Sequence, residues 1–415
     1  MIGTIDPTDK RAVVVGAGIS GLLIAYTLKR NGFQVEVLEA SSRVGGLIET
    51  LPTDFGMAEK AAHSLMITPE AKLWFQDLGV ELIPVSQNSK ARFIYRKGKM
   101  RKMPLRLIEI IKTLFHFFSK PKVIFNPETA SLQEWGETYL GKSATHFLLS
   151  PFVTGIFATS PQRLLAKLAF PKLVPADPSL SLFRHFRKRE KADRPQMMAP
   201  RGGMSEVIHA LARALKDEIK LNHTVNELPR TSNLILTVPS AALSKLIRKT
   251  DAQSAEALLQ VQYAPLISIT CFLKLQDFNR PPAGVGVLVP RNEGLRLLGC
   301  LFNSSAFENR VHTKEWISLT VMYGGTEDPE AMNLSDEELT QLLNLELNQL
   351  LKAQTPAEKI FITRWDRAIP IYSTTLKRAQ DSLQNGFCAV AGRIVFSNFS
   401  KEVSIRGLLN AMLHL

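Results

Sequence analysis

The chain has few cysteines and no long apolar segment. Its three cysteines are Cys271, Cys300 and Cys388, which lie far apart without the spacing of a metal site or a disulfide framework. We therefore expect buried thiols in a reducing compartment such as the cytoplasm. No stretch offers the roughly 20 apolar residues of a transmembrane helix, and the first residues are too charged for a signal peptide. These absences exclude a disulfide-stapled scaffold, a cysteine-ligated metal centre and an integral membrane protein.

Repeats and low-complexity tracts are also absent, and acidic residues are in deficit. Apolar residues make up 45% and charged residues 21% of the 415 positions, a composition typical of a globular chain with two or three domains. The 51 Lys and Arg residues exceed the 38 Asp and Glu residues, which gives a net charge of +13. Such an excess suits nucleic acid, anionic lipid or acidic small molecules. No nucleic-acid-binding module is recognisable, so we do not expect nucleic acid as a partner.

A glycine-rich turn lies between a predicted strand, residues 12–15, and a predicted helix, residues 22–28. Its glycines, Gly16, Gly18 and Gly21, have the spacing of a dinucleotide-binding loop. The first permits a tight turn, the second lets a pyrophosphate approach bare backbone, and the third lets the helix pack closely on the sheet. Free N–H groups and the dipole at the start of the helix favour the phosphate charge.

A carboxylate and a pair of glycines follow the second predicted strand. Glu39 ends that strand about 20 residues after the loop, where an acid accepts hydrogen bonds from the adenosine ribose. A carboxylate at this place disfavours a 2′-phosphate and therefore NADP. Arg43, Gly45 and Gly46 come next, and adjacent glycines again indicate close approach of backbone to a ligand. The cofactor-binding residues predicted here are Gly16, Gly18, Ile19, Ser20, Gly21, Glu39, Ala40, Arg43, Gly45 and Gly46.

Residues 105–122 are predicted to form a basic amphipathic helix. One face carries apolar residues at helical spacing, namely Leu107, Ile108, Ile111, Leu114, Phe115 and Phe118. Such a helix can lie in a membrane interface, or it can pack its apolar face on the protein core. A second basic cluster at residues 184–191 is either a solvated segment or a second contact with anionic lipid.

Periodicity predicts further elements along the chain. We expect a hairpin over 91–104 with its turn at Lys97 and Gly98, and an antiparallel sheet within 260–325. We also expect a buried strand over 233–239 and a strand over 386–392 that runs into glycine. Helices are expected over 68–78, 204–215, 335–352 and 403–415.

The residues after the second strand resemble a known signature. The pattern Glu-x-x-x-Arg-x-Gly-Gly at 39–46 is similar to the FAD-binding signature of the flavin amine oxidase and protoporphyrinogen oxidase superfamily. Further blocks resemble protoporphyrinogen oxidases in chain order, at residues 91–95, 150–173, 201–204, 303–310 and 320–325. The implied fold class is α/β plus α+β. It comprises a discontinuous Rossmann-like FAD-binding domain (1–88, 196–245 and 378–415), an antiparallel-sheet substrate-binding domain (89–104 and 246–377) and a helical, membrane-associating insert (105–195).

The resemblance also implies roles for residues outside the loop. Arg92 corresponds to an arginine that anchors a propionate of the substrate, and a guanidinium suits bidentate carboxylate binding. Gly155 corresponds to a glycine whose backbone approaches the substrate near the flavin, and Val225 to a residue whose backbone contacts adenine. Gly392 and Val403 are added to the expected cofactor contacts.

Catalysis is expected to depend on the cofactor, FAD, and we expect no catalytic side chain and no metal. The histidines His63, His116 and His223 are expected at the surface or in supporting positions.

The implied activity is oxidation of protoporphyrinogen IX to protoporphyrin IX with FAD and dioxygen in haem synthesis. The implied location is the cytoplasm, with peripheral attachment to an anionic membrane surface, and a homodimer is a further option. Two alternatives remain, namely coproporphyrinogen III oxidation by the same site and a flavin- or porphyrin-binding paralogue without oxidase activity. The last is suggested by departures from the family pattern at residues 59–62, 370–376 and 391–411.

Overall fold

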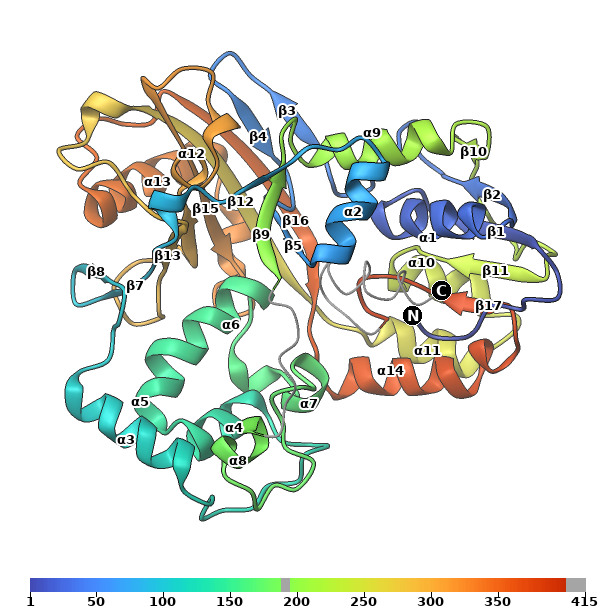
Figure 1. Ribbon diagram of the computed structural model, residues 1–415, viewed down its shortest axis with the longest axis horizontal. Helices are drawn as coiled ribbons and strands as arrows, with labels where there is room; N and C mark the ends of the chain where they lie inside the picture. The colour runs from blue at the N-terminus through green and yellow to red at the C-terminus, as the bar shows by residue number, and fades with distance from the viewer. Residues whose placement is uncertain (188–194, 401–415) are drawn as a thin grey trace.

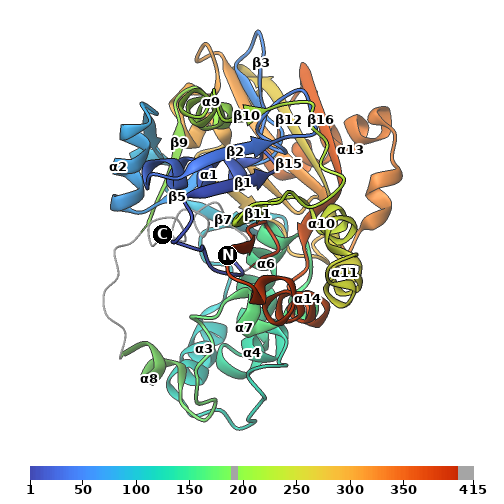
Figure 2. The same ribbon diagram turned by 90° about the vertical axis from the view of Figure 1, so that its right-hand side faces the viewer.

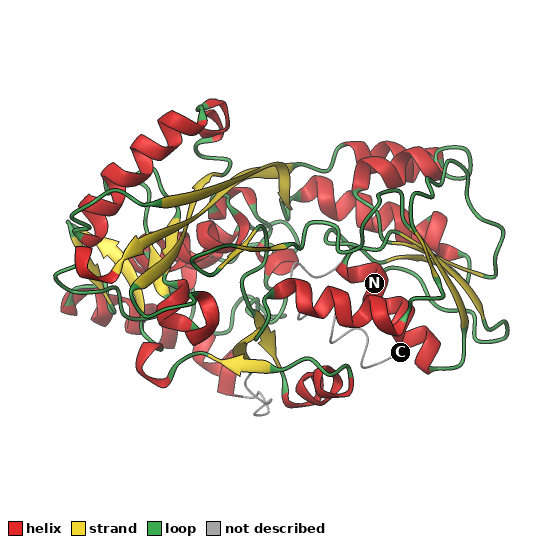
Figure 3. Cartoon of the chain, turned by 90° about the horizontal axis from the view of Figure 1, so that it is seen from above, coloured by secondary structure: helices red, strands yellow, loops and turns green. Residues whose placement is uncertain are grey.

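The computed structural model describes residues 1–187 and 195–400, which form three lobes. A parallel sheet with its helices lies on the right of Figure 1, a larger mixed sheet on the upper left, and a group of helices below. Figure 2 shows the helical lobe beneath the other two, and Figure 3 shows the two sheets at opposite ends of the molecule. The expected division into a nucleotide lobe, a sheet lobe and a helical lobe is present at this coarse level.

The parallel sheet collects strands from three separate parts of the chain, as expected of a discontinuous nucleotide lobe. In spatial order its strands are β10 (Ile219–Lys220), β2 (Gln34–Leu38), β1 (Arg11–Val15), β11 (Asn233–Leu236) and β17 (Arg393–Val395). Val15 at the end of β1 pairs with Leu38 and with Leu236, so the carboxyl ends of the three central strands align at one edge. Ligands of open parallel sheets bind at this edge.

Helices cover both faces of the parallel sheet. Alternate residues such as Val14, Val37 and Ile235 pack on α1 (Ile19–Arg30) and α9 (Met204–Ala214), with α2 (Pro69–Asp77) beside them. The other residues of the same strands, such as Val15 and Leu236, face α10 (Ser240–Ile247), α11 (Ala252–Leu259) and α14 (Thr374–Asn385).

The expected domain boundary after residue 245 is wrong. It cuts through α10, whose residues Leu243 and Ile247 share one core with Leu236 of the parallel sheet. Helix α11 follows and packs on α14. Helices α10 and α11 therefore both belong to the nucleotide lobe.

The second sheet is mixed and has seven strands. In spatial order they are β16 (Lys359–Pro370), β12 (Tyr263–Lys274), β15 (Trp316–Gly324), β14 (Gly299–Leu301), β13 (Gly286–Leu288), β7 (Arg92–Arg96) and β8 (Lys99–Arg101). The expected hairpin is confirmed as β7 and β8, with Lys97 and Gly98 at positive φ in its turn. The antiparallel sheet expected within 260–325 is confirmed by the pairings of β12 with β15, β14 with β15 and β13 with β14, whereas β7 joins it parallel to β13.

Only one face of the seven-stranded sheet is filled by its own helix. Residues such as Ile267, Ile269 and Val321 pack on α13 (Asp336–Leu351), which begins with a capping box between Ser335 and Glu338. Because side chains alternate along a strand, the intervening residues point toward the nucleotide lobe. We call this second surface the inner face.

Short elements connect the lobes. They are β3 (Thr50–Pro52), β4 (Met57–Glu59), β5 (Leu65–Ile67), β6 (Leu82–Pro84), β9 (Gln196–Pro200) and α12 (Asn303–Ala306). The helical lobe comprises α3 (Leu107–Phe118), α4 (Leu132–Tyr139), α5 (Lys142–Ala144), a π-helical turn (Thr145–Leu149), α6 (Ser150–Phe157), α7 (Ala166–Ala169) and α8 (Leu182–Arg187). The predicted helix 403–415 and part of the basic cluster 184–191 lie outside the described residues.

Helix α3 contains no buried residue. Leu107 is 75% exposed, Phe115 64% and Phe118 54%, and the other apolar residues of this face are also exposed. The alternative of a core-facing helix is therefore wrong. Within the described part of the chain, every helix is too short or too polar to cross a bilayer.

Candidate functional site

Two glycines of the loop after β1 are required by the fold itself. Gly16 has φ +105°, and a Cβ there would lie 2.7 Å from Oγ1 of Thr237. A Cβ on Gly21 would lie 1.8 Å from the carbonyl oxygen of Gly16, so any side chain would separate α1 from β1. These contacts confirm the close helix-to-sheet packing that the spacing predicts.

Gly18 and Gly46 form a cradle at the start of α1. Gly18 is the N-cap of the helix, and no side chain caps it. It forms a parallel bridge with Gly45, whose N–H donates to the Ala17 carbonyl at 2.8 Å. A Cβ on Gly18 would approach only the Gly46 Cα, at 4.0 Å, so a side chain would enter open space between the two glycines. A helix N-terminus with uncapped N–H groups and room for a ligand fits a pyrophosphate.

Glu39 is fixed beside this cradle. Its Oε2 accepts a hydrogen bond from the Ala17 N–H at 2.7 Å, and its Oε1 accepts from the Ser41 N–H at 2.9 Å and the Ser41 hydroxyl at 2.8 Å. A carboxylate oxygen can accept more than one hydrogen bond, so ribose hydroxyls could still bind there. The His223 N–H donates to the Glu39 carbonyl at 2.8 Å, which brings the loop that contains Val225 to the same edge.

Arg43 supports the glycine pair. Its guanidinium donates to the Gly46 carbonyl at 2.8 Å and pairs with Glu49 at 3.4 Å. Glu49 also accepts from the Lys60 ammonium at 2.8 Å, and this hydrogen bond lowers the pKa of the Glu49 carboxyl. Arg43 therefore holds the loop in shape through its contacts with backbone.

The C-terminal part of the prediction is wrong in register. The expected strand 386–392 is instead a 3-10 turn followed by Gly392, and β17 starts only after it. Gly392, with φ +80°, packs against the Ser232 carbonyl at the amino edge of the parallel sheet, away from the cradle. Residues 396–400 follow β17 and lie at the carboxyl edge of the sheet. They are absent from the predicted site residues, although the apolar run 394–396 could have indicated the strand that leads to them. Val403 lies outside the described residues.

The predicted substrate residues meet on the inner face. Arg92 pairs with Gly286, and Ile94 pairs with Leu288, so their side chains lie on one side of the sheet. Gly155 of α6 packs on the same Leu288, because a Cβ on Gly155 would lie 2.5 Å from the Leu288 Cδ2 atom. Arg92 is exposed, and its guanidinium makes no ion pair or hydrogen bond with the residues that the structure describes. The structure thus brings Arg92 and Gly155 to the same face of the sheet, with Gly155 packed on Leu288 and Arg92 two positions away on the neighbouring strand.

A buried ion pair joins the nucleotide lobe to the sheet lobe. Glu59 accepts from the Arg310 guanidinium at 2.9 Å, from the Met204 N–H at 2.8 Å and from the Thr50 hydroxyl at 2.8 Å. Both charged side chains are only 3% exposed. Burial raises the pKa of Glu59 and lowers that of Arg310, while the attraction between the opposite charges works against both shifts. In the sequence, Glu59 stands out only within a departure from the family pattern, so its ion pair with Arg310 was not predicted.

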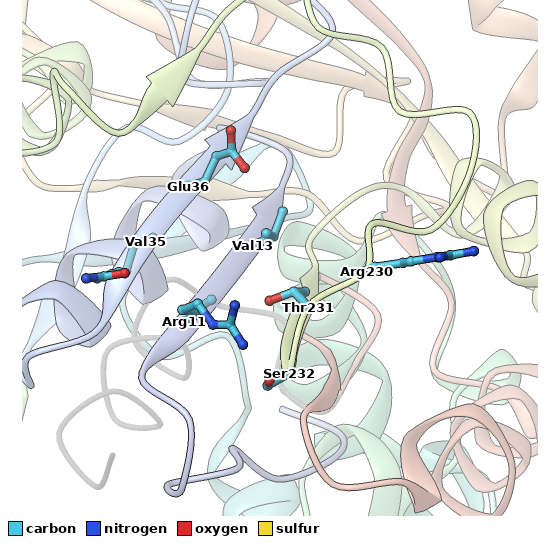
Figure 4. A pocket seen from close by; sticks show the side chains of 9 residues that line it. Arg11, Val13, Val35, Glu36, Arg230, Thr231 and Ser232 are labelled. Carbon is cyan, nitrogen blue, oxygen red and sulfur yellow. The ribbon is translucent and has the colours of Figure 1, made fainter.

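A separate cavity of about 540 Å³ lies at the other edge of the parallel sheet (Figure 4). It is lined by the first residues of β1 and β2 and by residues 230–232, at the amino ends of the strands. Two of its charged residues have partners, since Arg11 pairs with Asp9 and Glu36 pairs with Lys220. Because it lies at the amino ends of the strands, this cavity is separate from the cradle.

Comparisons with known proteins supplement this geometry. A family model described as flavin containing amine oxidoreductase matches residues 19–385. The chain is 27% identical to protoporphyrinogen oxidase 2, chloroplastic/mitochondrial, of Arabidopsis thaliana, over 91% of this chain and 88% of that protein. It is 20% identical to coproporphyrinogen III oxidase of Bacillus subtilis, over 95% of this chain and 94% of that protein. A solved structure of a candidate protoporphyrinogen oxidase from Exiguobacterium matches with a TM-score of 0.76 at 19% identity, over 99% of this chain and 100% of the other, which is a likeness of fold.

Proposed function

Because this chain belongs to the flavin-containing amine oxidoreductase family, we propose that it oxidises a porphyrinogen, with protoporphyrinogen IX as the substrate and dioxygen as the final electron acceptor. The protein is an FAD-dependent oxidoreductase. Its similarity to porphyrinogen oxidases extends over about nine tenths of both chains, which supports a porphyrinogen as the substrate class.

The nucleotide lobe supplies the groups that would hold FAD. The cradle of Gly18 and Gly46 suits the pyrophosphate, and Glu39 suits the ribose hydroxyls. The loop that contains Val225 would contact the adenine. When bound, the flavin supplies the two-electron acceptor, and the residues of the chain bind and orient the substrate.

The observation that carries the proposal is the position of Arg92 and Gly155 on the same face of the sheet, with Gly155 packed on Leu288. The free Arg92 guanidinium would bind a propionate of the substrate through charge-assisted hydrogen bonds. The row of Ile94, Leu288 and Met322 offers an apolar surface for the macrocycle. Gly155 lets α6 approach that row closely, which narrows the space for a flat ligand.

Anaerobic addition of protoporphyrinogen to the purified flavoprotein tests the activity. We expect the visible absorbance of the flavin to bleach, and porphyrin fluorescence to develop after air is admitted. Unchanged absorbance together with no fluorescent product would contradict the proposal. A yellow protein that fails this test would favour the paralogue without oxidase activity.

Replacing Arg92 tests the substrate contact. We expect Arg92→Gln to raise KM by about tenfold with little change in kcat, the effect of losing one charge-assisted hydrogen bond. The matched control is Arg213→Gln on α9 of the nucleotide lobe, whose side chain is also exposed, and its KM should stay at the wild-type value. Equal KM values for both variants would remove Arg92 from the substrate site.

Coproporphyrinogen III is the second candidate substrate. The Bacillus subtilis relative carries that activity in its name and matches nearly the whole chain. A tetracarboxylate would require more cationic groups on the inner face than Arg92 alone. Parallel turnover measurements with the two porphyrinogens decide between them, since the preferred substrate has the larger kcat/KM.

We further propose that α3 attaches the protein to an anionic membrane surface at the cytoplasmic side. Six exposed apolar residues lie on one face of this helix, and Val123 and Ile124 continue the patch. Monomeric soluble proteins rarely expose so large a contiguous apolar surface. Lys112, Lys120 and nearby basic residues would contact lipid phosphates while the apolar residues enter the interface.

Vesicle sedimentation tests the attachment. The wild-type protein should bind vesicles that contain anionic phospholipid, and Phe115→Asp should reduce the bound fraction several-fold because it places a carboxylate in the apolar interface. Lys112→Glu should weaken binding more at low salt than at high salt. Failure of the wild type to bind, together with a dimer in solution that Phe115→Asp dissociates, would instead assign the patch to a homodimer interface.

A further inference from the structure

His63 lies at the junction of the nucleotide and sheet lobes, and its Nε2 atom has no partner. The atom is buried and makes no hydrogen bond with residues 1–187 or 195–400. The large majority of buried polar side-chain atoms in native proteins are hydrogen-bonded, so this atom calls for a partner beyond the residues that the structure describes. Burial and the nearby Arg310 guanidinium lower the pKa of His63 to about 3, which keeps the imidazole neutral.

A continuous set of contacts leads from the cradle to His63. The Gly46 carbonyl accepts from Arg43, Arg43 pairs with Glu49 at 3.4 Å, and Glu49 pairs with Lys60 at 2.8 Å. Lys60 and His63 belong to the same short segment between β4 and β5. The segment is therefore linked to the backbone of the cradle at Gly46.

The sheet lobe holds the same segment from the opposite side. Trp365 of β16 donates from Nε1 to the Lys60 carbonyl at 3.1 Å, and Arg310 donates to the His63 carbonyl at 2.9 Å. Glu39 would hold the adenosine half of a dinucleotide, and the junction that holds His63 is linked to the same cradle at Gly46.

The inner face offers a second unpaired atom. The Ser268 hydroxyl on β12 is buried and has no hydrogen-bond partner within the described ranges. Ser268 pairs with Met322, which belongs to the same row as Leu288. Each lobe therefore has a buried polar atom, in His63 and Ser268, that can hydrogen-bond to a ligand.

We propose that His63 hydrogen-bonds through Nε2 to the ring system of the bound flavin and thereby positions it between the two lobes. The assignment rests on the flavin site of the proposed function. It gives His63 a role as a positioning residue that binds the cofactor directly through a neutral side chain.

The test measures cofactor binding in the full-length holoprotein. Equilibrium dialysis should give an FAD dissociation constant about three- to tenfold larger for His63→Leu than for wild type, the effect of one hydrogen bond. The visible absorption band of the bound flavin should shift, because the ring loses a polar contact. His63→Gln keeps an amide donor and acceptor and should restore most of the affinity and of the spectrum. His209→Leu, at an exposed position on α9, is the matched control and should change neither.

Wild-type affinity and spectrum in His63→Leu would overturn the proposal. Equal losses in His63→Leu and His63→Gln would also overturn it, because a packing role alone would explain them. This experiment uses no porphyrinogen, so it tests the role of His63 even if the proposed oxidation is wrong. A wild-type protein that does not bind FAD would refute both the role of His63 and the proposed oxidation.

Discussion

At the scale of single residues, the three glycines of the nucleotide loop are required for different reasons. Gly16 and Gly21 are needed because a Cβ at either position meets protein atoms. Gly18 is different, since its φ of −69° suits any residue and a Cβ would meet open space beside Gly46. Folding therefore requires glycine at positions 16 and 21, whereas the proposed ligand requires it at position 18.

Two alanine substitutions separate these requirements. Gly18→Ala should leave the unfolding free energy of the apoprotein within about 1 kcal/mol of wild type, but should weaken FAD binding by tenfold or more because the methyl group occupies the cradle. Gly21→Ala should destabilise the apoprotein by about 2 kcal/mol or more, since helix and strand are forced apart. Urea denaturation of both apoproteins and FAD titration of the folded fraction provide the measurements. A normal FAD affinity in Gly18→Ala would contradict the cradle.

Residue-level prediction from sequence succeeded where neighbours along the chain define the geometry. Gly16, Gly18 and Glu39 lie within one strand–helix–strand unit, so their spacing alone predicts their positions. Gly392 failed because its position depends on which residues of the last strand pair with β11, and that pairing is non-local. The sequence predicts His63 only at the surface or in a supporting position, because the burial of its Nε2 atom cannot be inferred from a single histidine in the sequence.

At the scale of elements, an ion pair in the first turn of α3 joins this helix to the sheet lobe. Arg96 of β7 donates to Glu109 at 2.8 and 3.0 Å and to the Pro104 carbonyl, and its guanidinium lies 3.5 Å from the centre of the Phe147 ring. Glu109 also accepts from the Arg106 N–H at 2.6 Å and so caps the helix. This nearly buried ion pair fixes the start of the helix, while Phe117 packs on the core near its end.

The ion pair gives the stability a defined pH dependence. Arg96 lowers the pKa of Glu109 to about 2 from an ordinary value of 4.5, so the pair stabilises the fold above pH 4.5 and loses this contribution as the pH falls toward 2. Glu109→Gln should therefore reduce the unfolding free energy by about 1 to 3 kcal/mol near neutral pH, and the difference from wild type should shrink below about pH 4.5. Urea denaturation at a series of pH values measures it. A difference that stays constant down to pH 3 would show that Glu109 acts without its charge.

Local elements were predictable and their partners were not. The hairpin of β7 and β8 follows from a turn with Lys97 and Gly98, and the helix α3 from its apolar spacing. The parallel pairing of Arg92 with Gly286 joins segments distant in sequence, and no local pattern encodes it. That pairing is what places Arg92 on the face of the sheet that carries Leu288, the residue on which Gly155 packs.

At the scale of the whole molecule, the ion pair between Glu59 and Arg310 couples the nucleotide lobe to the sheet lobe. Arg310→Met should reduce the unfolding free energy by about 3 to 5 kcal/mol, because it leaves the Glu59 charge buried without its partner. Lys249→Met, which breaks a fully exposed pair with Glu227, is the control and should leave the free energy of unfolding nearly unchanged. Thermal unfolding of the apoproteins compares them. Equal losses in the two variants would mean that the buried pair contributes no more than a surface pair.

One core runs through the helical lobe and the nucleotide lobe. Trp135, Tyr139 and Val153 of the helical lobe pack with Val15 and Leu236 of the parallel sheet in a single cluster of buried residues. The helical lobe is continuous in sequence, yet its inner surface is also the covering of the sheet that binds FAD. The helical lobe therefore cannot be exchanged by itself. A chimaera that receives the helices of a relative would also need that relative's residues on the face of the parallel sheet that carries Val15 and Leu236.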